Sequence, residues 1–395
     1  IFLIFSSIEF LLWFLPIFLI VYGITPRKYR NLTLLVGSIV FYARGDVRYL
    51  PLLMISILCN YFLGLHLAKR SPKTLWRKKL LLILTLGANL AVLLWFKDWG
   101  GSAGLPLGIS FYTFQILSYQ IDVYRGEVSR EYSFLKFATY VIMFPKLISG
   151  PITRYGDISD SLTAYSMEIY FDFWGYSLMA MGLGRMMGIE LPANFRRPYM
   201  ARSVRDFYRR WHMTLGQWFC RYVYIPLGGS RQGELRTIFN LLVVWMLTAF
   251  WHGAGWNFFC WGGLLWICIV LERQLGRLKF VHKMKVLPHI YLWLVIPMSW
   301  MCFAITDLSQ LQVYLDKMLW LVPGFSGGYE DAWKALSTYG GLLLVSGLAC
   351  TPVIEKLYHK WQDKLPVKVL LSGLFWYCIW RLLLEGNNPF MYFSF

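Results

Sequence analysis

Long apolar runs separated by short basic loops set the strongest limit on how this chain folds. Hydrophobic residues make up 57% of its 395 residues, and charged residues only 15%. Soluble globular chains carry about a quarter charged residues. The sequence therefore predicts an all-α membrane protein that crosses the bilayer several times, because helices satisfy their own backbone hydrogen bonds inside lipid. We expect one integral-membrane domain over residues 1–395, without soluble domains.

The lengths of the apolar runs point to a bundle with irregular spans. The runs cover residues 8–24, 32–42, 50–67, 80–96, 105–121, 137–149, 169–187, 211–227, 238–252, 256–271, 290–305, 339–353 and 367–384. A full helical span needs about 20 residues, so the shorter runs are predicted to tilt or to form re-entrant segments. Glycine and proline interrupt the runs at 104–108, 144–151 and 225–229. Any one interruption suits an ordinary turn, but together they favour an internal cavity or tunnel.

The net charge of +18 is concentrated in the loops. The basic clusters are residues 27–30, 69–79, 196–210, 273–285 and 356–368. Basic loops stay on the cytosolic side, so both termini are predicted to be extracytoplasmic. This pattern explains the charge without a nucleic-acid partner, and part of it also suits an anionic cytosolic ligand. The seven cysteines are scattered with no metal-binding spacing, so no metal site is expected.

His252 is the first candidate for chemistry, because it lies alone in an apolar stretch. Residues 235–271 read as a helical hairpin with basic ends, and the turn at 251–256 contains this histidine. An ionisable side chain at membrane depth is a functional candidate by default. The glycines that follow would let another group approach closely. A structural histidine that bonds to a neighbouring helix is an equally good interpretation.

A second set of candidates lies between residues 172 and 212. His212 follows Arg209-Arg210-Trp211 and is predicted to start an amphipathic helix over 211–224. The arginines before it resemble a phosphate-binding ledge, although plain topological charge explains them equally well. They are Arg196, Arg197, Arg202, Arg205, Arg209 and Arg210. Asp172 places a carboxylate in an aromatic apolar run, where a structural hydrogen bond is the favoured role.

These motifs together resemble the membrane-bound O-acyltransferases, in particular the bacterial alginate O-acetyltransferase branch. The matching stretches occur in order along the whole chain. They are Phe5-Ser6-Ser7-Ile8-Glu9-Phe10, Leu105-Pro106-Leu107-Gly108-Ile109-Ser110-Phe111-Tyr112-Thr113-Phe114, Gly150-Pro151-Ile152 with Arg154-Tyr155, Tyr170-Phe171-Asp172-Phe173-Trp174-Gly175-Tyr176-Ser177, Arg209-Arg210-Trp211-His212, Tyr224-Ile225-Pro226-Leu227-Gly228-Gly229, Trp251-His252-Gly253 and Asn388-Pro389-Phe390-Met391-Tyr392-Phe393.

The resemblance implies a ring of tilted helices around a central tunnel in a bacterial inner membrane. It implies that His252 is the invariant catalytic residue and His212 the second active-site position. Asp172, Trp211, Trp251 and Asn257 are the expected supporting residues. The implied donor is acetyl-CoA, a substrate rather than a bound cofactor. The implied acceptor is a hydroxyl on the extracytoplasmic side, on a polysaccharide or on an SGNH-type acetyltransferase partner protein.

Two positions depart from the pattern of the family. Its members usually carry about two more spans between the Gly-Pro-Ile and Phe-Asp-Phe motifs, whereas this sequence joins them abruptly near Leu162-Thr163. The favoured interpretation is that a segment is omitted there. An Arg-Asp pair of the family is replaced by Cys220-Arg221. A role for that pair is therefore in doubt, although Arg221 can substitute in part.

The expected reaction divides its work between the two histidines. Neutral His252 would remove the proton of the acceptor hydroxyl, and His212 would polarise the thioester carbonyl or position the donor. A covalent acyl-His252 intermediate stays open. So does transfer of D-alanine from a carrier-protein thioester to teichoic acid. A transporter of a small acid or lipid precursor is disfavoured because few ionisable residues lie in the runs, and a catalytically silent scaffold is weakly disfavoured because both histidines are present.

Overall fold

The computed structural model describes residues 7–67, 75–99, 104–147, 162–276, 286–318 and 329–385. Within these ranges the chain is helical and contains no strand, which confirms the predicted all-α class. Six helical segments in the described ranges are long and apolar enough to cross a membrane, and one bent pair of helices would add a seventh. The protein is therefore a multi-pass helical membrane protein.

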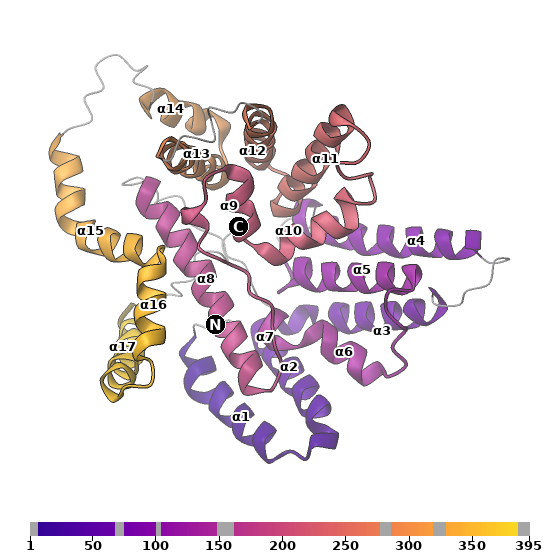
Figure 1. Ribbon diagram of the computed structural model, residues 1–395. Helices are drawn as coiled ribbons and strands as arrows, with labels where there is room; N and C mark the ends of the chain where they lie inside the picture. Colours follow the sequence, from indigo (N-terminus) through magenta and orange to yellow (C-terminus); the bar gives the residue numbers. More distant parts are fainter. Residues whose placement is uncertain are drawn as a thin grey trace. The chain divides into compact units, whose positions relative to one another are not determined.

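The helices form two compact units, of which the first consists of residues 1–150, 178–191 and 378–389. It contains α1 (Leu15–Ile24), α2 (Arg30–Asp46), α3 (Leu50–Leu67), α4 (Leu75–Leu94), α5 (Ile109–Arg125), α6 (Phe134–Ile142) and α7 (Phe144–Leu147). Helices α3, α4 and α5 lie side by side (Figure 1). Paired amides of Asn60 and Asn89 join α3 to α4 at 2.9 and 3.0 Å. Such bonds hold helices together in lipid, where apolar burial gives little preference.

The second unit consists of residues 151–177, 192–377 and 390–395. Its helices are the first part of α8 (Leu162–Met186), α9 (Val204–Arg210), α10 (Met213–Phe219), α11 (Glu234–His252), α12 (Trp256–Leu275), α13 (Leu287–Ala304), α14 (Leu308–Met318), α15 (Tyr329–Ala349), α16 (Pro352–Trp361) and most of α17 (Leu365–Glu385). Helix α8 divides at Ser177, so its last residues belong to the first unit.

The hairpin predicted over residues 235–271 is confirmed as α11 and α12, which pack against each other and are neighbours in Figure 1. Gly262 permits this close packing. A Cβ atom at this position would lie 2.9 Å from the Trp245 carbonyl oxygen and 3.0 Å from the Ala249 Cβ. Helix α13 packs on the other side of α12. Together with α9, α10 and the residues between them, these three helices carry the cavity described in the next section.

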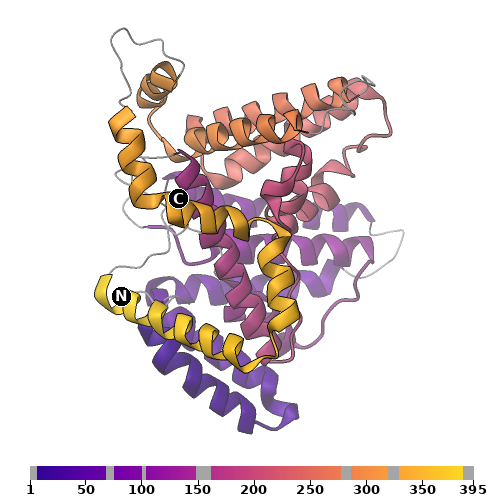
Figure 2. The same ribbon diagram turned by 60° about the vertical axis from the view of Figure 1, so that its left-hand side comes forward.

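The C-terminal part of the second unit contains a sharp bend. The axes of Gly340–Ala349 in α15 and of α16 differ by 72°, and Figure 2 shows this turn in the orange and yellow helices. Pro352 follows the break, and the Thr351 hydroxyl caps α16 by accepting a hydrogen bond from the Val353 N–H. The pair forms a broken span or a re-entrant segment, as the short run at 339–353 predicts.

Most predicted runs correspond to helices, with two informative differences. The helix predicted from residue 211 begins only at Met213, because the backbone of His212 is left-handed and cannot continue a helix. The interruption predicted at 144–151 starts with the short helix α7, and the rest of it lies outside the described residues.

Several further sequence features cannot be placed. The Gly150–Tyr155 motif and the end of the chain after residue 385 lie outside the described ranges. At the abrupt join, α8 begins at Leu162 and continues through Thr163, and the preceding residues are not described.

Candidate active site

Both predicted histidines line one cavity inside the second unit. The cavity has a volume of about 120 Å³. Its wall is mostly aromatic and includes the imidazoles of His212 and His252. The described lining residues are Tyr208, Trp211, His212, Leu215, Gly216, Phe219, Val244, Trp245, Thr248, His252, Trp261, Trp300 and Phe303.

A short extended segment holds the backbone of His212 in an unusual conformation. His212 lies between α9 and α10 with φ of 45°, in the left-handed region. Residues 194–196 run beside it. The N–H of Met213 donates to the Asn194 carbonyl at 2.9 Å, and the N–H of Arg196 donates to the Arg210 carbonyl at 2.9 Å. A strained non-glycine residue held from both sides in this way is typical of a functional position.

The imidazole of His212 is buried and has one hydrogen bond. Its Nδ1 lies 3.1 Å from the Asn194 Oδ1, whereas its Nε2 is buried without a hydrogen-bond partner. The residue lies outside the candidate spans. Burial lowers the pKa of His212 to about 3, because the charged form loses hydration. The ring is therefore neutral at physiological pH.

His252 ends α11 and is surrounded by aromatic rings. The ring centroids of Trp251, Phe303 and Trp261 lie 4.6, 4.9 and 5.1 Å from its own. The next residue, Gly253, allows Phe258 to approach, because a Cβ atom there would lie 2.4 Å from that ring. The expected close approach at the glycine after His252 is thus present, and the approaching group is an aromatic ring.

The supporting residues differ in how closely they approach the histidines. Trp251 contacts both imidazoles, with its ring centroid 6.0 Å from that of His212. Trp211 lines the cavity. Asn257 is buried and donates from Nδ2 to the Phe303 carbonyl at 3.4 Å, so it anchors a ring that contacts His252. Asp172 is half-buried on α8 and is not among the described residues of the cavity wall.

A larger hollow of about 610 Å³ adjoins the cavity, and we call it the vestibule. The two spaces share the wall residues Tyr208, Gly216, Val244 and Trp245. Three arginines line the vestibule: the predicted Arg205 and Arg209, and Arg273 at the end of α12. Glu272 also lines it, but its carboxylate accepts the backbone N–H groups of Val204 and Arg205 at the start of α9. The vestibule is therefore a basic hollow beside the histidine cavity.

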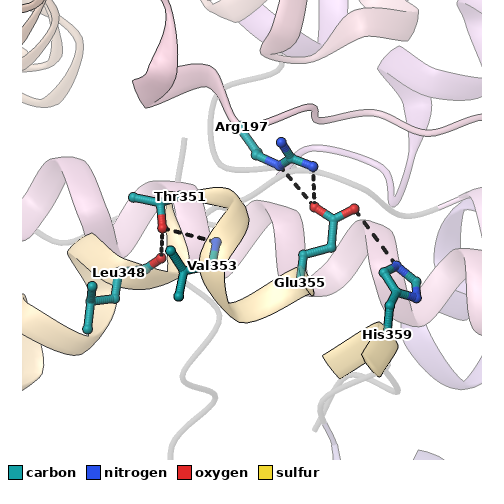
Figure 3. Close-up of polar contacts among 6 residues, drawn as sticks. All are labelled: Arg197, Leu348, Thr351, Val353, Glu355 and His359. Atoms are coloured by element: carbon teal, nitrogen blue, oxygen red, sulfur yellow. Dashed lines mark hydrogen bonds and ion pairs between the residues drawn. The ribbon is translucent and has the colours of Figure 1, made fainter. Parts of the chain in front are cut away.

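The other four arginines of the predicted ledge lie elsewhere. Arg197 donates two hydrogen bonds to the Glu355 carboxylate on α16, at 2.9 and 2.5 Å (Figure 3). Arg210 forms an ion pair with Asp206 at 3.0 Å. Arg196 and Arg202 are exposed. Only Arg205 and Arg209 of the six thus line the vestibule wall.

Three residues of the site were missed by the sequence analysis. Tyr208 lines both the cavity and the vestibule, Arg273 adds to the basic wall, and Asn194 bonds to His212. Tyr208 lies among the predicted arginines and Asn194 lies two positions before the first of them, but no spacing marked either residue. Within the described ranges, no group of three histidine, cysteine, aspartate or glutamate side chains is arranged to bind a metal ion.

Comparisons with known proteins identify relatives of this chain. The sequence model described as the membrane-bound O-acyltransferase family matches residues 161–309, which include both histidines. The chain is 34% identical to a probable alginate O-acetylase of Pseudomonas putida, over 78% of each chain. It is 32% identical to a peptidoglycan O-acetyltransferase of Helicobacter pylori, over 81% of this chain and 80% of the relative. It is 24% identical to a teichoic acid D-alanyltransferase of Bacillus subtilis, over 50% of this chain and 67% of the relative.

Proposed function

Because this chain belongs to the membrane-bound O-acyltransferase family, we propose that it transfers an acetyl group from acetyl-CoA to a hydroxyl group. The donor comes from the cytosol, and the acceptor lies on the extracytoplasmic side of a bacterial inner membrane. The acceptor belongs to an exopolysaccharide, to a cell-wall polymer, or to an SGNH-type partner protein that passes the group on. Relatives named as alginate and peptidoglycan O-acetylating enzymes support this acceptor class.

The observation that carries the proposal is the basic vestibule beside a small cavity with two histidines. Coenzyme A has several phosphate groups and a long, thin thioester arm. Arg205, Arg209 and Arg273 offer guanidinium groups, which bind phosphate oxygens in pairs. The adjoining cavity of about 120 Å³ suits the reacting end of the donor and not the nucleotide. We therefore assign the vestibule to the nucleotide end of the donor.

The charge pattern supports the proposed direction of transfer. The 19-residue helix α11 rises about 28 Å from Glu234 to His252 at about 1.5 Å per residue. Its first end adjoins the basic residues Arg231 and Arg236, which we place in the cytosol. His252 then lies near the outer side. In this orientation both termini are extracytoplasmic, and a donor that enters from inside meets an acceptor from outside.

The chemistry requires a base and a group that stabilises negative charge. A hydroxyl oxygen attacks the thioester carbonyl carbon and loses its proton to the base. The tetrahedral intermediate then expels the CoA sulfur as a thiol, which takes up that proton, and the acetyl ester remains. Two imidazoles in one aromatic cavity can divide these tasks between them.

A second donor is favoured by one finding, the similarity to teichoic acid D-alanyltransferases. In that alternative the vestibule receives a carrier protein with a thioester arm. The identity and coverage are lower than for the O-acetylating relatives, so acetyl-CoA is the preferred donor. Transfer from acetyl-CoA with no carrier protein present would separate the two.

The direct test uses labelled acetyl-CoA and full-length protein in lipid bilayers. We expect label to move from acetyl-CoA to a polysaccharide acceptor, and His252→Ala to lower the rate by at least about a hundredfold, since a general acid–base group contributes 10²–10⁴. His66→Ala is the matched control, because His66 lies in the first unit on α3. Full transfer by folded His252→Ala protein would refute the assignment of this site.

A further inference from the structure

The hydrogen bonds around His212 specify which of its nitrogens carries a proton. An isolated neutral imidazole can be protonated at either nitrogen. At His212 the choice depends on Asn194, whose side-chain oxygen lies 3.1 Å from Nδ1. The tautomer therefore depends on which way the Asn194 amide points. The oxygen and nitrogen of an amide are nearly indistinguishable in size, so their hydrogen-bond partners decide the orientation.

The backbone of Thr214 establishes the orientation of the Asn194 amide. The Thr214 N–H can only donate, and it points to the Asn194 side-chain atom nearest His212, at 3.3 Å. The Thr214 hydroxyl donates to the same atom at 2.9 Å. This atom must therefore be the oxygen. The amide nitrogen then faces the Ser177 hydroxyl at 3.5 Å.

An oxygen in this place requires a proton on Nδ1 of His212, because two lone pairs at 3.1 Å would repel each other. In the neutral ring Nε2 then carries the free lone pair. That nitrogen is buried and has no hydrogen-bond partner, and the ring lines the cavity. A buried polar atom without a partner is uncommon and needs an explanation. A hydroxyl that donates to Nε2 would satisfy it.

We propose that Asn194 is a positioning residue that holds His212 in the Nδ1–H tautomer, so that Nε2 accepts the proton of the acceptor hydroxyl. This inference rests on the proposed acetyl transfer and deepens it. It reverses the division of tasks expected from the sequence, where His252 is the base and His212 acts on the carbonyl. An imidazole in this tautomer has no N–H at Nε2 to offer a developing oxyanion, so that task passes to other groups of the cavity wall, among them His252 and the indole N–H groups of Trp261 and Trp300.

The proton balance of this step is complete within the cavity. The acceptor O–H bond breaks as its oxygen attacks the carbonyl carbon, and the proton moves to Nε2 of His212. The C–S bond then breaks, and the leaving sulfur takes the proton back from Nε2. Burial disfavours an isolated imidazolium, but the oxyanion forms in the same step and in the same cavity, so the two charges offset each other. The Asn194 oxygen accepts from Nδ1–H throughout.

The first measurement is the tautomer itself, which does not depend on activity. Full-length protein with ¹⁵N-labelled histidine is placed in bilayers and studied by solid-state NMR, and the His212→Gln spectrum identifies the His212 signals. We expect a protonated Nδ1 and a bare Nε2 near neutral pH. A protonated Nε2 in active wild-type protein would overturn the inference and leave the proposed function intact. If His212 has the expected Nδ1–H tautomer but the protein transfers no acetyl group, both the role of His212 as base and the proposed function are overturned.

The second measurement compares two substitutions of Asn194. Asn194→Leu removes the acceptor, so we expect a mixture of tautomers and a kcat lower by about 10²- to 10⁴-fold, within the range for a misoriented base. Asn194→Asp keeps an oxygen at this place, so the Nδ1–H tautomer and most of the lost kcat should return. Ser177→Ala is the control, since it removes only the contact on the far side of the amide. Equal losses in the leucine and aspartate variants, with the tautomer unchanged, would contradict the proposal.

Discussion

His212 shows how a single residue can combine backbone strain, burial and one directed hydrogen bond. Its left-handed backbone separates α9 from α10 and turns its side chain into the wall of the cavity. The motif Arg209-Arg210-Trp211-His212 was enough to single it out in the sequence. Its tautomer was not predictable, because that depends on a side chain 18 positions earlier that returns beside it through tertiary packing.

The roles of the arginines also depend on residues distant in the sequence. Six of them share one basic segment and were equivalent in the sequence. In the structure Arg205 and Arg209 line the vestibule, while Arg197 binds Glu355, which lies 158 positions later. No local pattern contains information about such a distant partner. The sequence thus offered this segment as a candidate phosphate site beside plain topological charge, and the structure alone shows which guanidinium groups line the vestibule.

Substitutions of the arginines that line the vestibule should therefore weaken donor binding more than substitution of Arg197. Substitution Arg209→Gln should raise the apparent KM for acetyl-CoA by about tenfold or more, because a hydrogen bond to a charged group contributes about 1.5–3 kcal/mol. Arg205→Gln and Arg273→Gln should act in the same direction. Steady-state kinetics at varied acetyl-CoA concentration measure the effect.

Arg197→Gln is the matched control for this prediction. It breaks the contact with α16 but removes no group from the vestibule, so the KM for acetyl-CoA should stay within about twofold of the wild type. Equal changes in KM for Arg197 and Arg209 variants would show that the arginines act through overall charge and not through the vestibule.

At the scale of elements, α10 contributes to the walls of both hollow spaces. Gly216 in this helix belongs to the wall of both. A Cβ atom there would meet only the Tyr208 carbonyl oxygen, at an ordinary 3.7 Å. A methyl group therefore fits, whereas a longer side chain would project into the space that the proposed route assigns to the thioester arm.

We expect Gly216→Ala to retain most activity and to stabilise α10 slightly, because alanine favours helix over glycine by about 1 kcal/mol. Gly216→Leu should lower kcat/KM at least about tenfold while the protein stays folded. Transfer rates and thermal unfolding of the two variants check this. A leucine variant as active as the alanine variant would mean that the donor takes another route.

The hairpin α11–α12 was the element most accessible from sequence. The prediction used two apolar runs on either side of a glycine-containing turn, with basic residues at both ends of the pair. The predicted ends of the hairpin lie close to the observed ends of α11 and α12. The helix after His212 was placed two residues too early, because a left-handed residue leaves no mark in hydropathy. Hydrophobic patterns locate helices well, whereas single backbone torsions depend on the segments that hold them.

At the scale of the whole molecule, the apolar composition predicted a multi-pass helical protein, and the structure confirms it. The grouping of helices was not predictable. Helix α8 is one continuous run in the sequence, yet its two parts belong to different units. Such a division depends on contacts between residues far apart in the chain. The local pattern of a single sequence does not predict these contacts.

The proposed orientation in the membrane leads to a further prediction. In a variant without native cysteines, a new thiol at Ser230 before α11 should react only with a reagent supplied from the cytosolic side. A thiol at Ala254, between α11 and α12, should react only from the outside. Both positions are exposed. Labelling of intact cells and of inverted vesicles with a membrane-impermeant maleimide distinguishes the sides, and the reverse pattern would invert the proposed direction of transfer.

The left-handed backbone of His212 also has a consequence for how such a protein changes under selection. A non-glycine residue in that conformation holds about 1–3 kcal/mol of strain. Glycine at this position would relax the chain and would also delete the imidazole. Glycine at position 212 would therefore raise the stability of the fold but lower the rate of the proposed transfer. Laboratory evolution screened for stability alone would therefore favour a more stable protein that lacks the His212 imidazole.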